Sequence, residues 1–287
     1  KVEKIKLVKQ GNTLVLKKIQ NQWVVESADN YPANVSTIKK FLLDLTAIKT
    51  INIKTSDPLQ YRNLAVNKIE DEGHNRFQIT IFNESGNEIE KFIVKEKFHN
   101  DTRTFIKKAG QKEVFETQGA VSLSINKIEW LNADITNLSS KAIDKITIDH
   151  IDEQFTLIRM KDSIHFKIDK LDDNLLEKSP IFTSAIAAFL ESLKFNDVKG
   201  REITNDSKRL SSFIFKTTSD EEIKVEDFET DSGVFTEFSI GKKSSAKTDS
   251  IFIDPSSVNK FVFKLPKYKR RLLDRRLSDL TKRSGSK

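Results

Sequence analysis

The sequence predicts an α+β protein made of two similar tandem repeats, residues 1–140 and 141–287. Each repeat is expected to form an antiparallel sheet with a long amphipathic helix packed on one face and a second helix that closes it. Three observations carry this prediction. The chain of 287 residues is long enough for two domains. Segments with the alternating pattern of half-buried strands recur in the same order in both halves. In each half, a proline and an apolar stripe at helical spacing follow the first strands.

The first strands of each repeat come from short alternating segments. VEKIKL, which begins at Val2, resembles IDKITI, which begins at Ile143. In the same register, TLVL at Thr13 matches QFTL at Gln154, and a third alternating segment follows in each half. Alternate side chains of a strand lie on opposite faces, so each segment predicts a strand with one apolar face. Gly11-Asn12 supplies a tight turn between the first two strands.

An amphipathic helix follows these strands in each repeat. Pro32 stands six residues before Ile38, and Pro180 stands six before Ile186. Ser179 is a suitable N-cap for the second helix, with a proline at the first helical position. The apolar positions are Val35, Ile38, Phe41, Leu42, Leu45 and Ile48 in the first helix, and Ile186, Phe189, Leu190 and Leu193 in the second. Each helix therefore presents one apolar stripe to the sheet of its own repeat.

A hairpin, two further strands and a closing helix complete each repeat. The matched segments are RFQITIFNESGNEIEKFIV with SSFIFKTTSDEEIKVEDF, TFIKK with SIFID, EVFE with KFVF, and SLSINKIEWLNADI with YKRRLLDRRLSDL. In the last pair, Ile125 aligns with Leu272 and Trp130 with Leu277. The basic end of the chain is therefore expected to be the closing helix of the second repeat.

The positive charge of the protein is concentrated in that closing segment. Residues 264–287 contain ten Lys or Arg and two Asp, a net charge of +8, which leaves −1 for the rest of a chain whose total is +7. A helix with four leucines docked on the sheet leaves its basic side chains at the rim. An acidic protein or anionic lipid headgroups suit such a rim, and nucleic acid suits it less, because its binders spread basic residues over a face of the fold. The docked leucines are Leu272, Leu273, Leu277 and Leu280, and the candidate partner-binding residues are Lys269, Arg270, Arg271, Arg275 and Arg276.

The sequence contains no pattern that predicts catalysis, a cofactor or a metal. Its lack of cysteine excludes disulfides and thiolate metal sites. His150 is expected at a strand end and His165 facing solvent, while His74 and His99 lie in loops without a helical ligand partner. The acidic clusters lack the alternating spacing of a calcium loop, so we expect solvated charge. These clusters are Glu70-Asp71-Glu72, Asp172-Asp173 and Asp220-Glu221-Glu222.

Several segments resemble one bacterial protein family. QWVVESADNYPANVSTIKKFLLDLTAIKT, followed by SDPLQYRNLAV, resembles the opening of the family called domain of unknown function 4340. FIKKAGQKEVFETQG and INKIEWLNADI resemble its next strands and its helical break, and IHFKIDKL with FLESLKFNDVKG resembles a second copy. Leu64-Ala65-Val66 stands where the family pattern has a Gly-Leu pair.

The resemblance implies an envelope protein on the periplasmic side, held by an N-terminal transmembrane helix absent from this chain. It also implies association with a membrane-protein partner in an ABC-type transport system of the gliding-motility type. The family has no established activity, so the resemblance implies no catalytic residue. The sequence therefore predicts a non-enzymatic accessory or scaffold subunit. Two alternatives stay open: a binder of anionic lipid or nucleic acid through the basic C-terminal helix, and a cryptic hydrolase.

Overall fold

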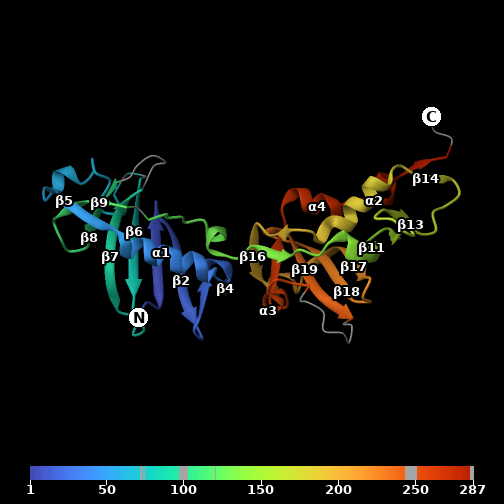
Figure 1. The fold of residues 1–287 in the computed structure, drawn as a ribbon, viewed down its shortest axis with the longest axis horizontal. Coiled ribbons are helices and arrows are strands. Elements are labelled where there is room, and N and C mark those ends of the chain that lie inside the picture. Colours follow the sequence, from blue (N-terminus) through green and yellow to red (C-terminus); the bar gives the residue numbers. More distant parts are fainter. Residues whose placement is uncertain (72, 74, 97–102, 120, 243–250, 285–287) are drawn as a thin grey trace. The chain divides into compact units, whose positions relative to one another are not determined.

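The molecule is mainly antiparallel β-sheet, and its helices are short (Figure 1). The computed structural model describes residues 1–287 except 72, 74, 97–102, 120, 243–250 and 285–287. Among the described residues the longest helix, α1 (Val35–Ala47), has 13 residues. The predicted α+β class with long amphipathic helices is therefore wrong. The described residues divide into two compact units, Lys1–Asn132 and Ala133–Lys287.

The first unit is built on a nine-stranded sheet in the order β4-β3-β2-β1-β6-β7-β8-β9-β5. All of its strand pairs are antiparallel. Its turn between β1 and β2 is centred on Gln10 and Gly11, both with positive φ, one residue earlier than predicted. The strands are β1 (Lys4–Lys9), β2 (Asn12–Ile19), β3 (Gln22–Val25), β4 (Tyr31–Pro32), β5 (Lys49–Thr55), β6 (Arg76–Phe82), β7 (Glu88–Lys95), β8 (Arg103–Lys108) and β9 (Val114–Gln118).

The second unit is built on an eight-stranded sheet in the order β13-β12-β11-β17-β18-β19-β20-β16. Two small sheets accompany it, one of β10 with β15 and one of β14 with β21. The main strands are β11 (Ile143–His150), β12 (Gln154–Arg159), β13 (Phe166–Ile168), β16 (Asp197–Gly200), β17 (Lys208–Thr217), β18 (Glu222–Thr230), β19 (Gly233–Lys242) and β20 (Phe261–Lys264). The small sheets contain β10 (Asp134–Thr136), β14 (Leu175–Glu177), β15 (Leu193–Lys194) and β21 (Thr281–Arg283).

The two large sheets have the same strand order. The run β3-β2-β1-β6-β7-β8-β9-β5 of the first unit corresponds to β13-β12-β11-β17-β18-β19-β20-β16 of the second. A helix stands between the third strand and the edge strand in both units, α1 in the first and α2 (Pro180–Ala187) in the second. Phe41 and Phe189, which align in the sequence, are both buried. The equivalent of β8 is β19 and not the SIFID segment, because Phe252 forms only an isolated bridge with Thr136.

The second helix is shorter than its apolar spacing predicts. After α2 the chain tightens into the 3₁₀ turn η5 (Ala188–Leu190), and Ser192 has a positive φ of 45°. Leu193 is buried, but it lies in β15 and pairs with β10. A residue three positions after Leu190 is on the same face of a helix, yet an extended chain that turns back buries it equally well. The pattern therefore predicted one helix where the chain forms a helix and a strand.

The predicted closing helices are also broken up. In the second unit, α4 (Lys267–Leu273) and α5 (Leu277–Leu280) are separate. Their separation has a local cause, because the Asp279 carboxylate accepts from the Arg276 backbone N–H at 2.9 Å and so caps a new helix start. Leu273 and Leu280 are buried, whereas Leu272 and Leu277 are half-buried. In the first unit only the 3₁₀ turn η3 (Lys127–Trp130) forms, capped by the Asn126 side chain.

The Leu64-Ala65-Val66 segment ends a turn that follows η2 (Pro58–Gln60). The Val66 N–H donates to the Tyr61 carbonyl at 2.9 Å, and the Ala65 N–H donates to the Arg62 carbonyl at 3.2 Å. These are the two hydrogen bonds of a Schellman turn, which places its penultimate residue in the left-handed region. Ala65 accordingly has a φ of 52°. An alanine therefore stands in a conformation that favours glycine.

We expect Ala65→Gly to raise the free energy of unfolding by about 0.5–1 kcal/mol, because glycine lacks the Cβ that makes left-handed backbone costly. Ala47→Gly, at the last residue of α1, is the matched control. It should lower the free energy of unfolding by about 0.5–1 kcal/mol through lost helix propensity. Urea denaturation followed by circular dichroism measures both. A destabilised Ala65→Gly variant would contradict the turn assignment.

Candidate functional site

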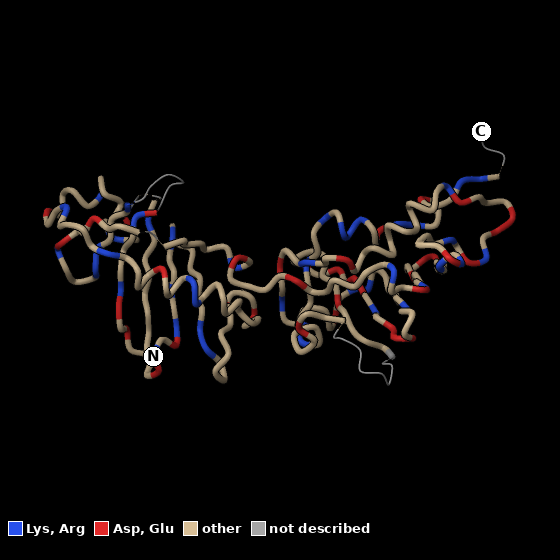
Figure 2. Tube along the Cα trace, in the orientation of Figure 1, with Lys and Arg blue, Asp and Glu red and all other residues tan. Residues whose placement is uncertain are grey.

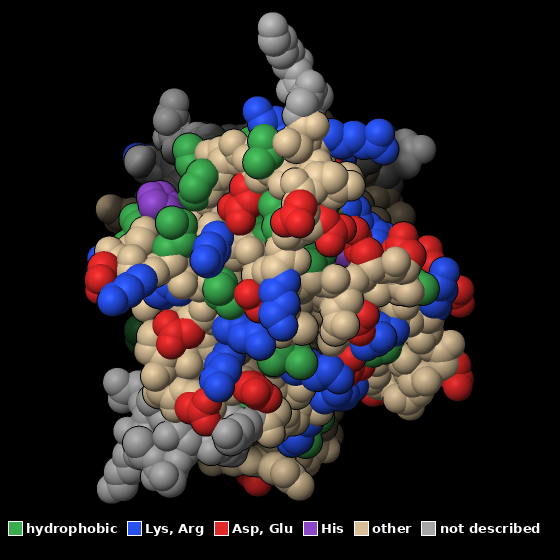
Figure 3. Space-filling model, turned by 90° about the vertical axis from the view of Figure 1, so that its right-hand side faces the viewer, with side chains coloured by type: hydrophobic (Ala, Val, Ile, Leu, Met, Phe, Trp, Pro, Cys, Tyr) green, Lys and Arg blue, Asp and Glu red, His purple; other side chains and the backbone are tan. Residues whose placement is uncertain are grey.

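Three of the five candidate partner-binding residues lie on α4, and the other two, Arg275 and Arg276, lie between α4 and α5. Figure 2 shows Lys and Arg gathered along α4, and Asp and Glu distributed through the rest of the second unit. On the face drawn in Figure 3, Lys and Arg side chains are interspersed with Asp and Glu. The environment of each basic residue therefore decides what it can bind.

Lys269 is an interior residue, with 8% of its surface exposed. Its Nζ donates to the carbonyl oxygens of Ala188, Phe189 and Glu191 at 3.2, 2.8 and 2.6 Å. These carbonyls close the end of η5, where a helix lacks internal hydrogen-bond donors. Burial lowers the pKa of Lys269, and the Glu191 carboxylate opposes that shift. Lys269 thus joins α4 to the end of η5 and is not available to a surface partner.

Three of the other four basic residues contact groups of the same unit. Arg270 pairs with Asp274 at 3.2 Å, and the Arg275 guanidinium lies 5.2 Å from the centroid of the Phe182 ring. Arg276 pairs with Asp152 and with Glu153. The Arg276 hydrogen bond lowers the pKa of the Asp152 carboxyl. Arg271 is exposed. The predicted basic rim is therefore largely compensated by neighbouring groups.

A polar pocket of about 390 Å³ lies between α4 and the ends of β11, β17 and β18. Its lining includes His150, Lys208, Ser211, Asp227, Arg270 and Arg276. Two of the five predicted residues, Arg270 and Arg276, thus meet three buried polar side chains that the sequence did not connect with them. Their separation along the chain hides this neighbourhood in the sequence, because only the fold brings the end of β18 under α4.

Asp227 is the most unusual group in this pocket. Only 1% of its surface is exposed, and its carboxylate accepts from the Thr236 hydroxyl at 2.6 Å. Burial raises its pKa from 3.8 to about 6, against the opposing effects of Thr236 and of the Arg270 charge. The Asp227 carboxyl therefore releases its proton at a higher pH than the carboxyl of an exposed aspartate does.

His150 is the last residue of β11, which agrees with its expected place at a strand end. Its Nε2 lies 3.0 Å from the Arg275 carbonyl oxygen. A carbonyl only accepts, so Nε2 carries the hydrogen. The ring also contacts Phe213 edge to face, with centroids 5.7 Å apart. His150 thus holds the junction of α4 and α5 against the sheet.

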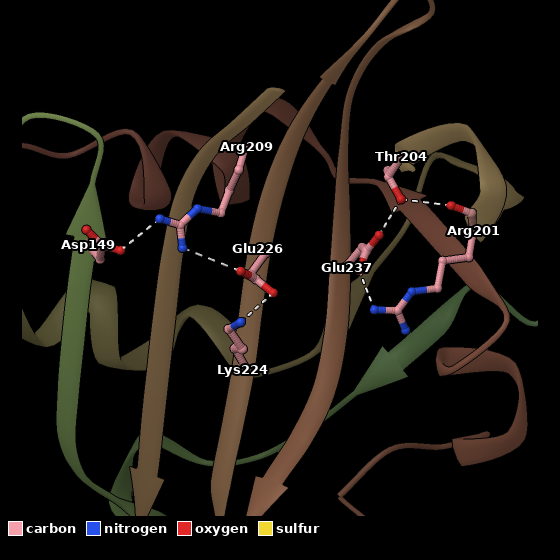
Figure 4. Close-up of polar contacts among 7 residues, drawn as sticks. All are labelled: Asp149, Arg201, Thr204, Arg209, Lys224, Glu226 and Glu237. Atoms are coloured by element: carbon pink, nitrogen blue, oxygen red, sulfur yellow. Dashed lines mark hydrogen bonds and ion pairs between the residues drawn. The ribbon is translucent and has the colours of Figure 1, made fainter. Parts of the chain in front are cut away.

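The opposite face of the same sheet carries a row of ion pairs (Figure 4). Arg209 on β17 bridges Asp149 at 3.1 Å and Glu226 at 3.6 Å. Glu226 in turn pairs with Lys224 at 2.8 Å. Nearer the sheet edge, the buried Glu237 accepts hydrogen bonds from Arg201 and Thr204 of η6 (Arg201–Thr204). Each carboxylate in this row has a partner, so the row aligns neighbouring strands across the sheet.

The first unit has an apolar groove of about 400 Å³ between the end of α1 and the sheet. In the second unit, aromatic side chains fill the position that corresponds to this groove. Through successive strand pairs, Lys108 on β8 takes the register position that Phe238 has on β19. Phe238 packs edge to face against Phe252 at 6.1 Å, and Phe252 is buried. The apolar lining of the groove is Leu45, Ile48, Ile81, Phe92, Ile106 and Phe115.

The remaining predicted positions have mixed outcomes. His74, His99 and Glu72 lie outside the described residues. His165 is half-buried, with its Nδ1 3.3 Å from the Ser184 hydroxyl of α2, and so does not simply face solvent. Glu221 is buried, because its backbone N–H and its carboxylate bind Thr217 and Ser219, whereas Asp172 and Asp173 are exposed as expected.

Within the ranges that the structure describes, no three His, Asp or Glu side chains are grouped so that they could hold a metal ion. In the same part of the chain, no helix has the length and apolar character needed to cross a bilayer.

The comparisons with known proteins identify a family. The family model described as "Domain of unknown function (DUF4340)" matches residues 23–199, more than half of the chain. Comparison with curated proteins gave no match, and comparison with solved structures gave none. The matched region runs from β3 through the first unit and as far as β16 of the second.

We expect Lys269→Met to lower the free energy of unfolding by about 2–4 kcal/mol, because three buried carbonyls lose a charged hydrogen-bond donor. Arg271→Met, two residues away and exposed, should change it by less than about 0.5 kcal/mol. Chemical denaturation of both variants checks this. Equal stabilities would show that Lys269 does not hold α4 to η5.

We expect the stability of the protein to fall as pH rises from about 4 to about 6. The native state keeps the Asp227 proton in this range while the unfolded state releases it, because burial raises the pKa of Asp227 to about 6. The loss is on the order of 3 kcal/mol, and Asp227→Asn should remove it. Asp231→Asn, at an exposed turn residue, is the control. Urea midpoints at pH 4, 5, 6 and 7 measure the effect, and an unchanged slope in Asp227→Asn would disprove it.

Proposed function

The chain belongs to the family of the domain of unknown function DUF4340, and on that premise we propose that it is a non-enzymatic accessory or scaffold subunit of an ABC-type transport system. We place it at the bacterial cell envelope, on the periplasmic side. Its task in this proposal is to bind a membrane-protein partner of that system. The observation that carries the proposal is the uncovered apolar surface of the first unit.

This surface combines the groove with the edge of the sheet. In the described part of the chain, β5 is the last strand of its sheet and pairs only with β9. Ile51 and Ile53 of β5 are 47% and 58% exposed, and Leu43 of α1 is 68% exposed. An exposed apolar edge strand is a template for pairing with another chain, and proteins usually protect it. The surface is therefore suited to partner binding.

The second unit supplies a precedent for what covers such a surface. There β15, which comes just before the edge strand β16, pairs with β10, and Thr136 of β10 also bridges Phe252. The equivalent edge strand, β16, has its Val198 side chain fully buried. The described residues of the first unit provide no extended segment of this kind. We infer that an extended segment of the partner adds to β5 and places an apolar side chain in the groove.

The alternative of an anionic-surface binder has weaker support. It requires the basic residues of α4 and of the α4–α5 junction to face a partner, but Lys269 is buried and Arg276 is paired with two carboxylates. Arg271 alone of the five is both exposed and outside these contacts. An interaction through so few charges would be weak at physiological salt, because exposed charges are screened over about 8 Å.

We expect Ile53→Lys to weaken association with the membrane subunits of the ABC-type system at least about tenfold, because a charge at the strand edge opposes pairing and apolar burial. Ile164→Lys, at a similarly exposed residue of the second unit (60%), should leave association unchanged. Binding of the purified chain to detergent-solubilised subunits measures both.

Salt separates this proposal from its alternative. An apolar interface should retain its affinity between about 0.1 and 0.5 M salt, whereas a basic surface should lose most of it. If Ile53→Lys binds normally and Arg271→Glu with Arg275→Glu abolishes binding, the anionic-surface function replaces the one proposed here.

A further inference from the structure

The first unit has a second pocket, of about 650 Å³, on the sheet face opposite the apolar groove. Its walls are the chain from Pro58 to Asp71 and the strands β7 and β8. Successive strand residues point to opposite faces, so Lys107 lines this pocket and Lys108 lines the groove. The polar lining residues are Tyr61, Arg62, Asn67, Lys68, Asp71 and Lys107.

The wall of this pocket is fixed by buried contacts. The Schellman turn at Ala65 directs the buried Val66 toward the sheet. Arg76, 2% exposed, donates from Nε and Nη2 to the Lys68 carbonyl at 3.2 and 2.8 Å, and also to the Asp71 carbonyl. Burial lowers the pKa of Arg76, although its guanidinium stays charged. The chain on both sides of Asn67 is thus held in place before any ligand arrives.

Asn67 is the buried polar side chain of this pocket. It is 9% exposed, and its Nδ2 donates to the Asp71 carboxylate at 3.2 Å. That contact defines the orientation of the amide, because a carboxylate accepts and cannot donate. The Asn67 Oδ1 is buried and has no hydrogen-bond partner among the described residues. A buried acceptor without a donor is unfavourable, so the site is suited to a ligand that brings one.

The charges around Asn67 favour an anion. Among the described residues that line the pocket, Arg62, Lys68 and Lys107 are basic and Asp71 carries the one carboxylate. The Lys107 Nζ lies 5.0 Å from the centroid of the Tyr61 ring. The Tyr61 hydroxyl donates to the Lys112 carbonyl at 2.6 Å, which fixes the ring at the pocket wall. The pocket therefore offers positive charge and an aromatic ring, and the unpartnered Asn67 amide oxygen is buried in its wall.

We propose that this pocket binds an acidic monosaccharide of the uronic acid class. A sugar hydroxyl donates to the Asn67 Oδ1, the carboxylate lies among Lys68, Lys107 and Arg62, and the apolar edge of the sugar ring contacts Tyr61. The volume of about 650 Å³ lies within the range of small-molecule sites. Neither the family match nor the proposed partner surface assigns this site. Its ligand must have both a negative charge and a sugar ring. A neutral sugar lacks the charge, and inorganic phosphate lacks the ring.

The test is titration of the purified chain with glucuronate, glucose and inorganic phosphate, followed by calorimetry or by NMR chemical shifts. Glucuronate should bind saturably below about 10 mM, and glucose and phosphate should bind at least about tenfold more weakly. Lys107→Gln and Asn67→Ala should each weaken glucuronate binding at least about fivefold. Lys108→Gln, the adjacent lysine on the opposite face, should bind as the unchanged protein does.

Three results would overturn the proposal. They are no saturation by glucuronate up to about 10 mM, phosphate binding as tight as glucuronate binding, and equal effects of Lys107→Gln and Lys108→Gln. Thermal unfolding of Asn67→Ala separates loss of the site from loss of the fold, and Lys107→Gln tests the site even if Asn67→Ala unfolds. The assay contains no transport subunit, so it stands or fails independently of the partner-binding function.

Discussion

Both units must cover one face of a sheet with the same strand order, and they do so with different segments. In the second unit this face is covered by α2 together with η5, by α4, and by the segment around Phe252. The Lys269 ammonium connects two of these covers, because it donates to the three carbonyls at the end of η5. In the first unit α1 covers the sheet, and the turn between β8 and β9 is too short to add a second cover. The apolar groove follows from that difference.

The same covering accounts for the positive charge at the end of the chain. A helix that packs across a sheet brings its side chains against helix ends and strand ends, where carbonyls and carboxylates lack partners. Lys269, Arg270 and Arg276 meet such groups within their own unit. These contacts use part of the positive charge of the segment within its own unit, so its net charge does not by itself indicate a partner.

The positions of many strands along the chain could be predicted from sequence, because the period-two alternation in segments such as Ile143–His150 is typical of a strand with one buried face. The place of α1 and the start of α2 at Pro180, with Ser179 as its N-cap, could also be predicted, but the lengths of the later helices could not. Leu193 has helical spacing from Leu190 but lies in a strand, and a capping interaction at Arg276 divides the closing helix. Sites were the least predictable part. A lysine at position 269 and an asparagine at position 67 have the character of surface residues until the fold buries them.

One sheet order thus appears in a closed form and in an open form in a single chain. In the closed unit, Phe238 packs against two aromatic rings, those of Phe252 and Phe263, and Lys269 joins α4 to the end of η5. In the open unit, the apolar groove and the polar pocket lie on the two faces of β8. The consecutive residues Lys107 and Lys108 point to these two faces. A shared fold leaves function to the surfaces that loops and covers create on it. The binding surfaces proposed for this protein therefore both lie on its first unit, which leaves more of its sheet uncovered, while the second unit contributes a closed core.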